Sequence, residues 1–409
     1  MTMRIYPFLI LLIIASACAT QSEKTAKGIS SVQKISAEEI ADGSYLTKNH
    51  KGNPVIAWTE GDKEGGEVYL YYAVSQDSGR SFTDPVKVMT SRGTRFHGES
   101  MNKVAFKSDG TVIAVFEIKT PTEENKYAGV IMYSQSFDQG KSWERPRYLH
   151  TDTSAGIGRS FFDLSVLPNG EVGAVWLDGR NKLGDKGSSV FFTSTSGKNG
   201  FTRDQQIGET ICQCCRTDLY TDSDGKVHAV FRDILNDSIR DMVHSISLDT
   251  GKTFSKPVRI SADNWVIRGC PHTGPDLVRN KEGLHFSWYT AGGEAGVYYC
   301  NSPDNGKTFR QRELVSAHAR HPKITASDET IFIVWDEMIP KDSVYYARVG
   351  MQIRSGEERK AVYLSDTTVS SYFPQIQVLD EQRILASWTQ EENKKSYIVY
   401  KIINFKEDE

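Results

Sequence analysis

The sequence lacks clustered basic residues, because its 49 Lys and Arg are spread along 409 residues and balanced by 52 Asp and Glu, for a formal net charge of −3. A chain without basic runs offers no electrostatic surface to nucleic acid, so we exclude that class of partner. A convincing helical pattern is also missing. The hydrophobic fraction of 38% is still sufficient for a large core in a soluble domain.

One apolar segment, at the N-terminus, indicates membrane contact. Arg4 precedes an apolar run from Ile5 to Ile14, which is too short for a membrane anchor and is typical of a secretory signal. The small residues that follow end at Cys18, an arrangement that resembles a bacterial lipobox. The resemblance implies a lipoprotein signal peptide over 1–17, lipidation of Cys18, a flexible tether over 18–28 and anchoring of the exported chain to the bacterial cell envelope, at the outer membrane or its periplasmic face. The alternative is an ordinary signal peptide that contains a cysteine.

A repeat governs the rest of the chain, as it does in propellers, whose periods are about 40 to 50 residues. An aromatic residue ends a short apolar run in each of seven units, at Trp58, Phe116, Trp176, Phe231, Trp288, Trp335 and Trp388. Short β-branched and aromatic runs in each unit alternate with Gly, Asn and Asp turns, which predicts four antiparallel strands. We therefore predict an all-β fold, a seven-bladed β-propeller in a single domain over 29–409, with a six-bladed ring as the alternative.

The seventh unit, from Tyr372 to about Phe405, has three expected strands and no obvious fourth. The segment from Ser31 to Ile35 resembles the outer strands expected over 85–89 and 257–260. We predict that this N-terminal strand completes the last blade and closes the ring.

Four turns share one pattern, Ser-x-Asp-x-Gly-x-Ser/Thr-aromatic, beginning at Ser75, Ser136, Ser247 and Ser302. In such a turn Asp accepts backbone N–H bonds, Gly supplies a positive φ and the aromatic fills the blade. The pattern resembles the Asp-box (BNR repeat) of sialidase-like propellers, which specifies the fold but not the activity. Sialidases have six blades, so seven-bladed ulvan-lyase-type propellers are the nearer analogue in blade number. The Arg-Ile-Pro motif that sialidases carry ahead of their first Asp-box is missing here.

The loops between blades and the loops after each second strand should share one face, opposite the Asp-boxes. Binding groups collect on such loops, and this face is rich in Arg, His and Tyr, which suits a carboxylate or sulfate ligand. The alternative is that some Arg side chains only bridge neighbouring blades. The catalytic candidates are His97, His272, His321, Tyr289 and Tyr372, and the substrate-binding candidates are Arg159, Arg180, Arg216, Arg320 and Asp233.

Cys212, Cys214 and Cys215 begin the fourth unit, and Cys270 lies at the equivalent place in the fifth. If adjacent blades bring these loops together, the thiolates and the His272 imidazole could surround one structural zinc or copper ion. A disulfide between Cys270 and the cluster is equally compatible with export. Apart from the metal we expect no cofactor.

Three functions fit these residues. We favour elimination on an acidic, uronate-containing and possibly sulfated oligo- or polysaccharide, of lyase or dehydratase type, with Arg neutralising the carboxylate and His or Tyr as base and acid. An exo-α-sialidase would instead combine an Arg cluster with a Tyr nucleophile. The third function is non-catalytic glycan or metal binding by a surface lipoprotein. In each case we expect a monomer that contacts the membrane only through its lipid.

Overall fold

The computed structural model describes residues 31–37, 40–61, 67–181, 187–267, 269–341 and 344–406. The expected signal peptide, the lipidation site Cys18 and the tether lie outside these residues. No helix in the described part of the chain has the length and apolar character needed to cross a membrane.

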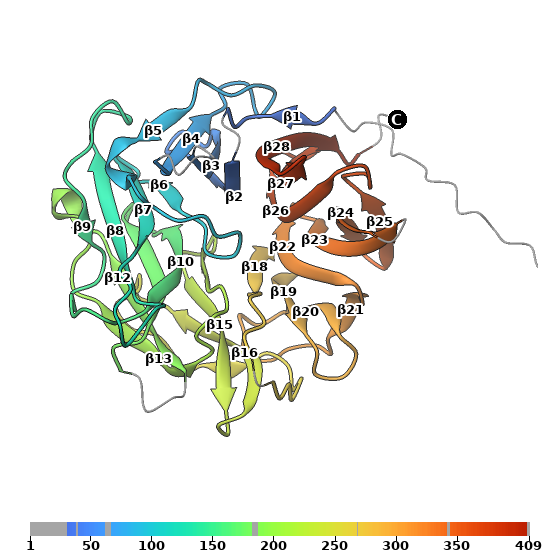
Figure 1. The fold of residues 1–409 in the computed structure, drawn as a ribbon. Helices are drawn as coiled ribbons and strands as arrows, with labels where there is room; N and C mark the ends of the chain where they lie inside the picture. The colour runs from blue at the N-terminus through green and yellow to red at the C-terminus, as the bar shows by residue number, and fades with distance from the viewer. Residues whose placement is uncertain are drawn as a thin grey trace, which may run out of the picture.

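The described residues form a ring of antiparallel four-stranded blades, and Figure 1 shows the ring face-on. In every blade but the last, the four strands follow one another in the sequence. The first three blades contain β2 (Ile40–Lys48), β3 (Pro54–Gly61), β4 (Tyr69–Val74) and β5 (Val86–Val88); β6 (Lys103–Phe106), β7 (Val112–Lys119), β8 (Gly129–Ser136) and β9 (Arg147–Tyr148); and β10 (Arg159–Val166), β11 (Val172–Asp178), β12 (Ser188–Ser194) and β13 (Gln205–Ile211). The next three contain β14 (Asp218–Thr221), β15 (Val227–Leu235), β16 (Ile239–Ser247) and β17 (Val258–Arg259); β18 (Asp276–Asn280), β19 (Gly283–Thr290), β20 (Gly296–Ser302) and β21 (Glu313–Ser316); and β22 (Ala319–Ala326), β23 (Thr330–Lys341), β24 (Val344–Ser355) and β25 (Glu358–Tyr363). The predicted all-β propeller is confirmed.

The last blade joins the two ends of the described chain. It contains β26 (Ser370–Val378), β27 (Arg383–Glu392) and β28 (Lys395–Asn404), and its fourth strand is β1 (Gln33–Lys34). Gln33 pairs with Tyr400 and Lys34 with Val399 in antiparallel register. In Figure 1 this closure lies beside β28, where the blue and red ends of the ribbon meet. The described strands pair in five sheets, two of eight strands and three of four, because neighbouring blades share pairing between β28 and β2 and between β13 and β15. The closing role predicted for the N-terminal strand is confirmed.

Two short 3-10 helices, η1 (Met89–Ser91) and η2 (Gly197–Asn199), lie in loops. The core lies within and between the blades, and the repeat aromatics Trp58, Trp176, Trp288 and Trp388 are completely buried in it. The Asp-box aromatics connect neighbouring blades: Phe82 packs on Tyr400 of the last blade with ring centroids 5.0 Å apart, and Phe254 packs on Phe192 of the third blade at the same distance. This cross-blade packing differs from the expected filling of a single blade.

The Asp-box turns have the predicted local hydrogen bonds. In the fourth blade Asp249 accepts the amide of Thr253 at 2.8 Å and the hydroxyl of Thr253 at 2.6 Å, while Ser247 Oγ accepts the Gly251 amide at 2.8 Å. These hydrogen bonds from Thr253 lower the pKa of Asp249 to about 2. Gly251 has a φ of 83°, a conformation that favours glycine.

Replacing Asp249 with alanine should lower the free energy of unfolding by about 1 kcal/mol, because the Thr253 amide and hydroxyl lose their acceptor in a turn that water can still reach. Leu248→Ala in the same turn is the matched control, because Leu248 is exposed. Urea unfolding of the two variants measures the difference, and equal midpoints would contradict a stabilising role for the Asp-box.

Candidate functional site

A ring of polar side chains lines the channel, one from each inner strand. Its members are Tyr45, Lys103, Asp163, Asp218, Asp276, Lys323 and Gln375. The three aspartates fasten each blade to the next: Asp163 accepts the Leu219 amide, Asp218 the Leu277 amide and Asp276 the Ile324 amide, at 2.9, 2.9 and 2.7 Å. Burial and the two neighbouring carboxylates raise the pKa of Asp218 well above its ordinary value. The three aspartates therefore join neighbouring blades of the ring.

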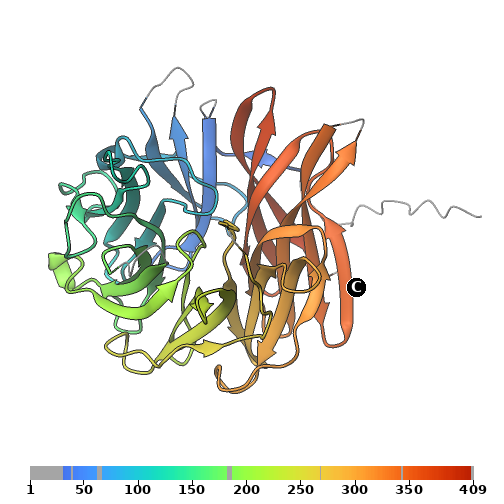
Figure 2. The ribbon, with the colours of Figure 1, turned by 60° about the horizontal axis from the view of Figure 1, so that its bottom comes forward.

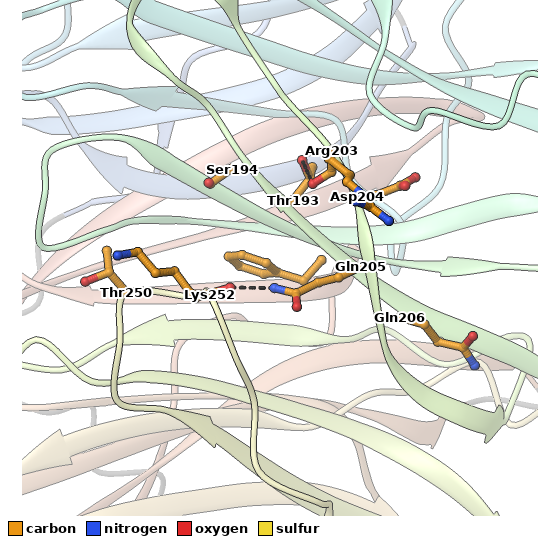
Figure 3. A pocket seen from close by; sticks show the side chains of 10 residues that line it. Thr193, Ser194, Arg203, Asp204, Gln205, Gln206, Thr250 and Lys252 are labelled. Carbon is orange, nitrogen blue, oxygen red and sulfur yellow. Dashed lines mark hydrogen bonds between the residues drawn. The ribbon is translucent and has the colours of Figure 1, made fainter.

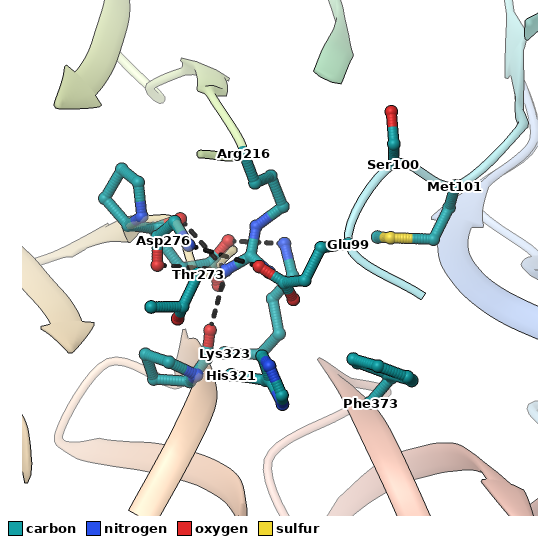
Figure 4. Close-up of polar contacts among 12 residues, drawn as sticks. Glu99, Ser100, Met101, Arg216, Thr273, Asp276, His321, Lys323 and Phe373 are labelled. Carbon is teal, nitrogen blue, oxygen red and sulfur yellow. Dashed lines mark hydrogen bonds and ion pairs between the residues drawn. The ribbon is translucent and has the colours of Figure 1, made fainter. Parts of the chain in front are cut away.

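The loop between β5 and β6 covers the channel through a buried ion pair, shown in Figure 4. Glu99 Oε1 lies 2.6 Å from Arg216 Nη1, and its Oε2 accepts the Gly274 amide at 3.1 Å. Arg216 Nη2 also donates to the carbonyls of Gly274, Pro275 and Pro322, at 3.3, 3.1 and 2.9 Å. We call residues 95–101 the cap loop. Because these contacts use its guanidinium and the side chain is buried, Arg216 holds the cap loop and has no face for a substrate.

Two of the predicted catalytic residues meet at the cap loop. His97 belongs to it, and the ring of His272 from the fifth blade lies 6.4 Å away, centroid to centroid. His97 Nδ1 accepts the amides of Glu99 and Ser100, at 3.1 and 3.0 Å, which places the proton of the neutral ring on Nε2. Burial, with the positive charge of Arg95, lowers the pKa of His97 to about 4. At neutral pH His97 is therefore an uncharged N–H donor.

His321 of the sixth blade has the opposite protonation tendency. Its Nδ1 lies 2.9 Å from each carboxylate oxygen of Asp336. Burial opposes the charge on the ring, but the Asp336 carboxylate outweighs it and raises the pKa of His321 above its ordinary value. The backbone of His321 has a φ of 48°, which is uncommon for a residue other than glycine and is a form of strain found at functional sites. Asp336 thus orients His321 and leaves its Nε2 as the reactive nitrogen.

Aromatic and cationic groups complete the mouth. Phe373 packs on His321 at 4.7 Å between ring centroids and on Tyr372 at 6.3 Å. The cap loop touches the same ring, since a β-carbon on Gly98 would lie 2.2 Å from Phe373. Arg320 is exposed, and its guanidinium lies 5.6 Å from the centre of the Tyr289 ring. The structure therefore places His97, His272, His321, Arg320, Tyr289 and Tyr372 around the mouth.

The remaining predicted binding residues are engaged within the protein. Arg159 is buried and lies 3.2 Å from both Asp178 and Asp152. Arg180 contacts Asp178 at 2.6 Å and Asp204 at 2.9 Å. Asp233 is half-buried on β15 and accepts the Ile234 amide at 2.8 Å. Like Arg216, these side chains have partners within the protein: Arg159 and Arg180 contact carboxylates, and Asp233 accepts a backbone amide. Their contact with a substrate stays a prediction.

The cysteines gather only in part. Cys212, Cys214 and Cys215 are buried, with Cys212 Sγ 3.8 Å from Cys214 Sγ and 3.3 Å from Cys215 Sγ. Cys270 is an exposed free thiol outside the cluster, so the structure shows neither the disulfide nor the metal site with Cys270 as a ligand, the two alternatives that the sequence left open. The loop that contains Cys270 packs against the cap loop instead of the cluster. Its His272 ring lies near His97, and its Gly274 amide donates to Glu99.

Phe373 was absent from the predicted site, and Asp336, which follows a predicted second strand and was expected on this face, was given no role. The sequence does contain a signal for Phe373. When the inner strands are aligned on the channel ring, the residues two positions before its members fall in one layer. This layer includes Phe161, Arg216, His321 and Phe373. Asp336 follows the repeat aromatic Trp335, and pairs with His321 because β22 and β23 are neighbours.

A separate cavity of about 640 Å³ lies between the third blade and the Asp-box of the fourth, and Figure 3 shows the side chains around it. Arg203, Gln206 and Lys252 line its edge, and Gln205 donates to the Gly251 carbonyl at 2.5 Å. It contains none of the predicted rim residues.

These observations define a propeller with an Asp-box face and a histidine-rich mouth. The chain belongs to the family described as BNR repeat-like domain, whose model matches residues 52–333. No curated protein matches it. A crystal structure of the polysaccharide lyase Uly1 is similar at a TM-score of 0.55 and 12% identity, covering 95% of this chain and 94% of that one. A Trypanosoma rangeli sialidase in complex with sialic acid has a TM-score of 0.49 and 9% identity, covering 91% of this chain and 58% of that one. At these identities the likeness concerns the fold.

Proposed function

We propose that the protein is a carbohydrate-active enzyme that cleaves an acidic, uronate-containing glycan by elimination at the channel mouth. The observation that carries this proposal is the pair of histidines with opposite protonation tendencies, His97 and His321, beside the exposed Arg320. Titratable groups whose pKa values are pushed apart by their surroundings are typical of catalytic sites, in which each group takes a different role. The similarity in fold to the polysaccharide lyase Uly1 agrees with a polysaccharide as the substrate.

The residues divide the reaction among them. Arg320 and the His97 Nε2–H bind the sugar carboxylate and withdraw charge from it, which acidifies the neighbouring C–H bond. Neutral His321 takes that proton on Nε2, and the electron pair of the broken bond becomes the C=C bond of the product. The glycosidic oxygen leaves with a proton from the Tyr289 hydroxyl, and water returns the proton to Tyr289 as His321 releases its own.

An exo-α-sialidase finds less support in the geometry. An Arg cluster for the sialate carboxylate would need Arg159 and Arg216 together with Arg320. The first two are buried and bound to carboxylates of the protein. One exposed guanidinium suits a single carboxylate contact at the mouth.

Incubation with uronate-containing and sialic acid-containing glycans tests the function. We expect the absorbance of an unsaturated uronate to rise with the wild-type protein and to remain at background with His321→Ala, a loss of at least about 10²-fold for a general base. Arg203→Ala, in the cavity of Figure 3, is the control and should keep full activity. Release of free sialic acid would favour the sialidase, and absence of product from every glycan would favour a binding protein.

The pH profile tests the role given to His321. Since the base must be neutral and Asp336 raises the pKa of His321, activity should increase with pH through a value above 6.5, its ordinary pKa. Asp336→Asn keeps an acceptor for the Phe373 amide, which the carboxylate accepts at 2.8 Å, but removes the charge. This variant should show a lower kcat and an acid limb shifted to lower pH. An unshifted limb would remove His321 from the role of base.

We also propose that the chain is exported and held at the bacterial envelope through Cys18, as a monomer. The motif at Ala15-Ser16-Ala17-Cys18 supports this placement. Labelling of the cells with a radioactive fatty acid should mark the wild-type protein and not Cys18→Ser.

A further inference from the structure

The loop that begins the fourth blade holds three sulfur atoms in a buried cluster. Cys212, Cys214 and Cys215 are at most 5% exposed, and their Sγ atoms lie within 4.8 Å of one another. It is the one such group of potential metal ligands found among the described residues. The spacings of 3.3 and 3.8 Å greatly exceed a disulfide bond of about 2.05 Å. Three ligands around one ion with metal–sulfur bonds of about 2.3 Å would stand about 4 Å apart, close to the observed spacing.

The charges around the cluster favour an anion. Arg240 Nη1 donates to Cys212 Sγ at 3.0 Å, and the Arg232 carbonyl accepts the Cys212 amide at 2.8 Å. The Arg232 side chain is buried, and its guanidinium donates to the carbonyls of Arg240, Thr273 and Tyr289. Neither arginine has a carboxylate within ion-pair distance in the described part of the chain. Arg232 also lies 4.9 Å from the centre of the Trp265 ring, and Arg240 is half-buried. The two guanidinium groups therefore place positive charge near the sulfurs, which favours thiolates over thiols.

We infer that Cys212, Cys214 and Cys215 bind one Cu(I) ion as three thiolates in a trigonal site. Three thiolates around a monovalent cation carry a net charge of −2, which the guanidinium groups of Arg232 and Arg240 balance. Thiolates select soft ions such as Cu(I), whereas structural zinc is almost always held by four protein ligands. The two further candidates, Cys270 and His272, do not belong to the group of ligand atoms that lie within 4.8 Å of one another.

The site lies next to the cap loop's anchor in the sequence. Cys215 directly precedes Arg216, whose guanidinium holds Glu99. The Ile211–Asp233 bridge, one residue before Cys212, joins the third blade to the fourth. Bound Cu(I) would therefore fix the loop that positions Arg216, and should stabilise the folded chain because the unfolded chain lacks the preformed site.

Anaerobic loading of the mature chain with Cu(I) tests this inference. After incubation with bathocuproine disulfonate as a competing chelator and desalting, elemental analysis should find about one copper per chain in the wild type, with a higher thermal midpoint than the apoprotein. Cys214→Ser should retain at least tenfold less copper and show no copper-dependent increase in midpoint. Cys270→Ser and Cys300→Ser are matched controls, exposed and buried respectively, and should bind as the wild type does.

Several results would overturn the inference. Wild-type protein that releases all its copper, or Cys214→Ser that retains as much as the wild type, excludes the site. Purified protein that retains zinc and resists exchange with Cu(I) excludes a monovalent ion. A mass lower by two hydrogens with loss of two thiols, mapped to Cys212 and Cys215, identifies the cluster as a disulfide instead. If the serine variants fail to fold, the metal content and the mass of the wild-type protein still test whether the site binds Cu(I).

Discussion

Replacing Arg216 with methionine is expected to lower the free energy of unfolding by about 3–5 kcal/mol, the usual cost of leaving one member of a buried ion pair without its partner. Glu99 would remain buried with the Gly274 amide as its one hydrogen-bond donor, and three carbonyls would lose their donor. Turnover should fall as well, because the cap loop carries His97. Urea unfolding followed by tryptophan fluorescence measures the first effect.

The double variant Glu99→Gln, Arg216→Met distinguishes the ion pair from simple loss of volume. The double variant should lose less free energy of unfolding than the two single variants lose in sum, because neither partner is then left charged and unpaired. Arg320→Met is the exposed control and should unfold like the wild type. A single Arg216→Met variant within about 0.5 kcal/mol of the wild type, the range of ordinary surface changes, would show that the pair does not hold the channel closed.

Mild acid should destabilise the protein through its buried histidines. Burial lowers the pKa of His150 and of His285 to about 4 and that of His244 to about 3, and His97 behaves alike. These folded-state pKa values are depressed below the ordinary value, so the stability they contribute is present above pH 6.5 and lost as pH falls toward 4. For each histidine that is protonated in the unfolded chain but not in the folded one, the free energy of unfolding falls by about 1.4 kcal/mol per pH unit. His321 acts in the opposite direction, because its pKa is raised.

Thermal midpoints measured between pH 7.5 and 4.5 test this expectation. The midpoint should fall steeply below pH 6.5, and His285→Gln, whose ring contacts Tyr299 and Asn280 inside the fifth blade, should show a shallower fall. His318→Gln, at an exposed position, should follow the wild type. A midpoint that stays constant between pH 6.5 and 5 would contradict the assignment of these histidines as neutral buried groups.

The sequence predicted the scaffold well because blade strands, turns and Asp-boxes are local and periodic. Ring closure was predictable for the same reason, since the segment around Gln33 has the pattern of an outer strand. The channel mouth was predicted less completely, because a list of its charged residues does not show which of them form ion pairs with one another. Arg216 and Glu99 are 117 residues apart, and Arg159 finds Asp178 within its own blade. The first pairing depends on how loops approach across the channel, which no local pattern encodes. The second joins directly opposite residues of β10 and β11 and depends on the register of those strands.

The cysteines show the same limit. The spacing of Cys212, Cys214 and Cys215 within one tight loop brings their sulfurs together whatever the neighbouring blade does. Cys270 belongs to another loop, whose course depends on contacts with Glu99 and His97. That the fourth and fifth blades are neighbours was therefore not enough to place the Cys270 thiol in the cluster.

The central proposal is that the acidic glycan binds at the channel mouth. Isothermal titration of an unsaturated uronate oligosaccharide, the product class, measures this directly. Arg320→Ala should weaken binding at least tenfold, about 1.4 kcal/mol, while the Arg203→Ala, Lys252→Ala double variant in the cavity of Figure 3 should bind as the wild type does. Unchanged binding by Arg320→Ala together with loss of binding by the double variant would contradict the account and place the glycan on the Asp-box face.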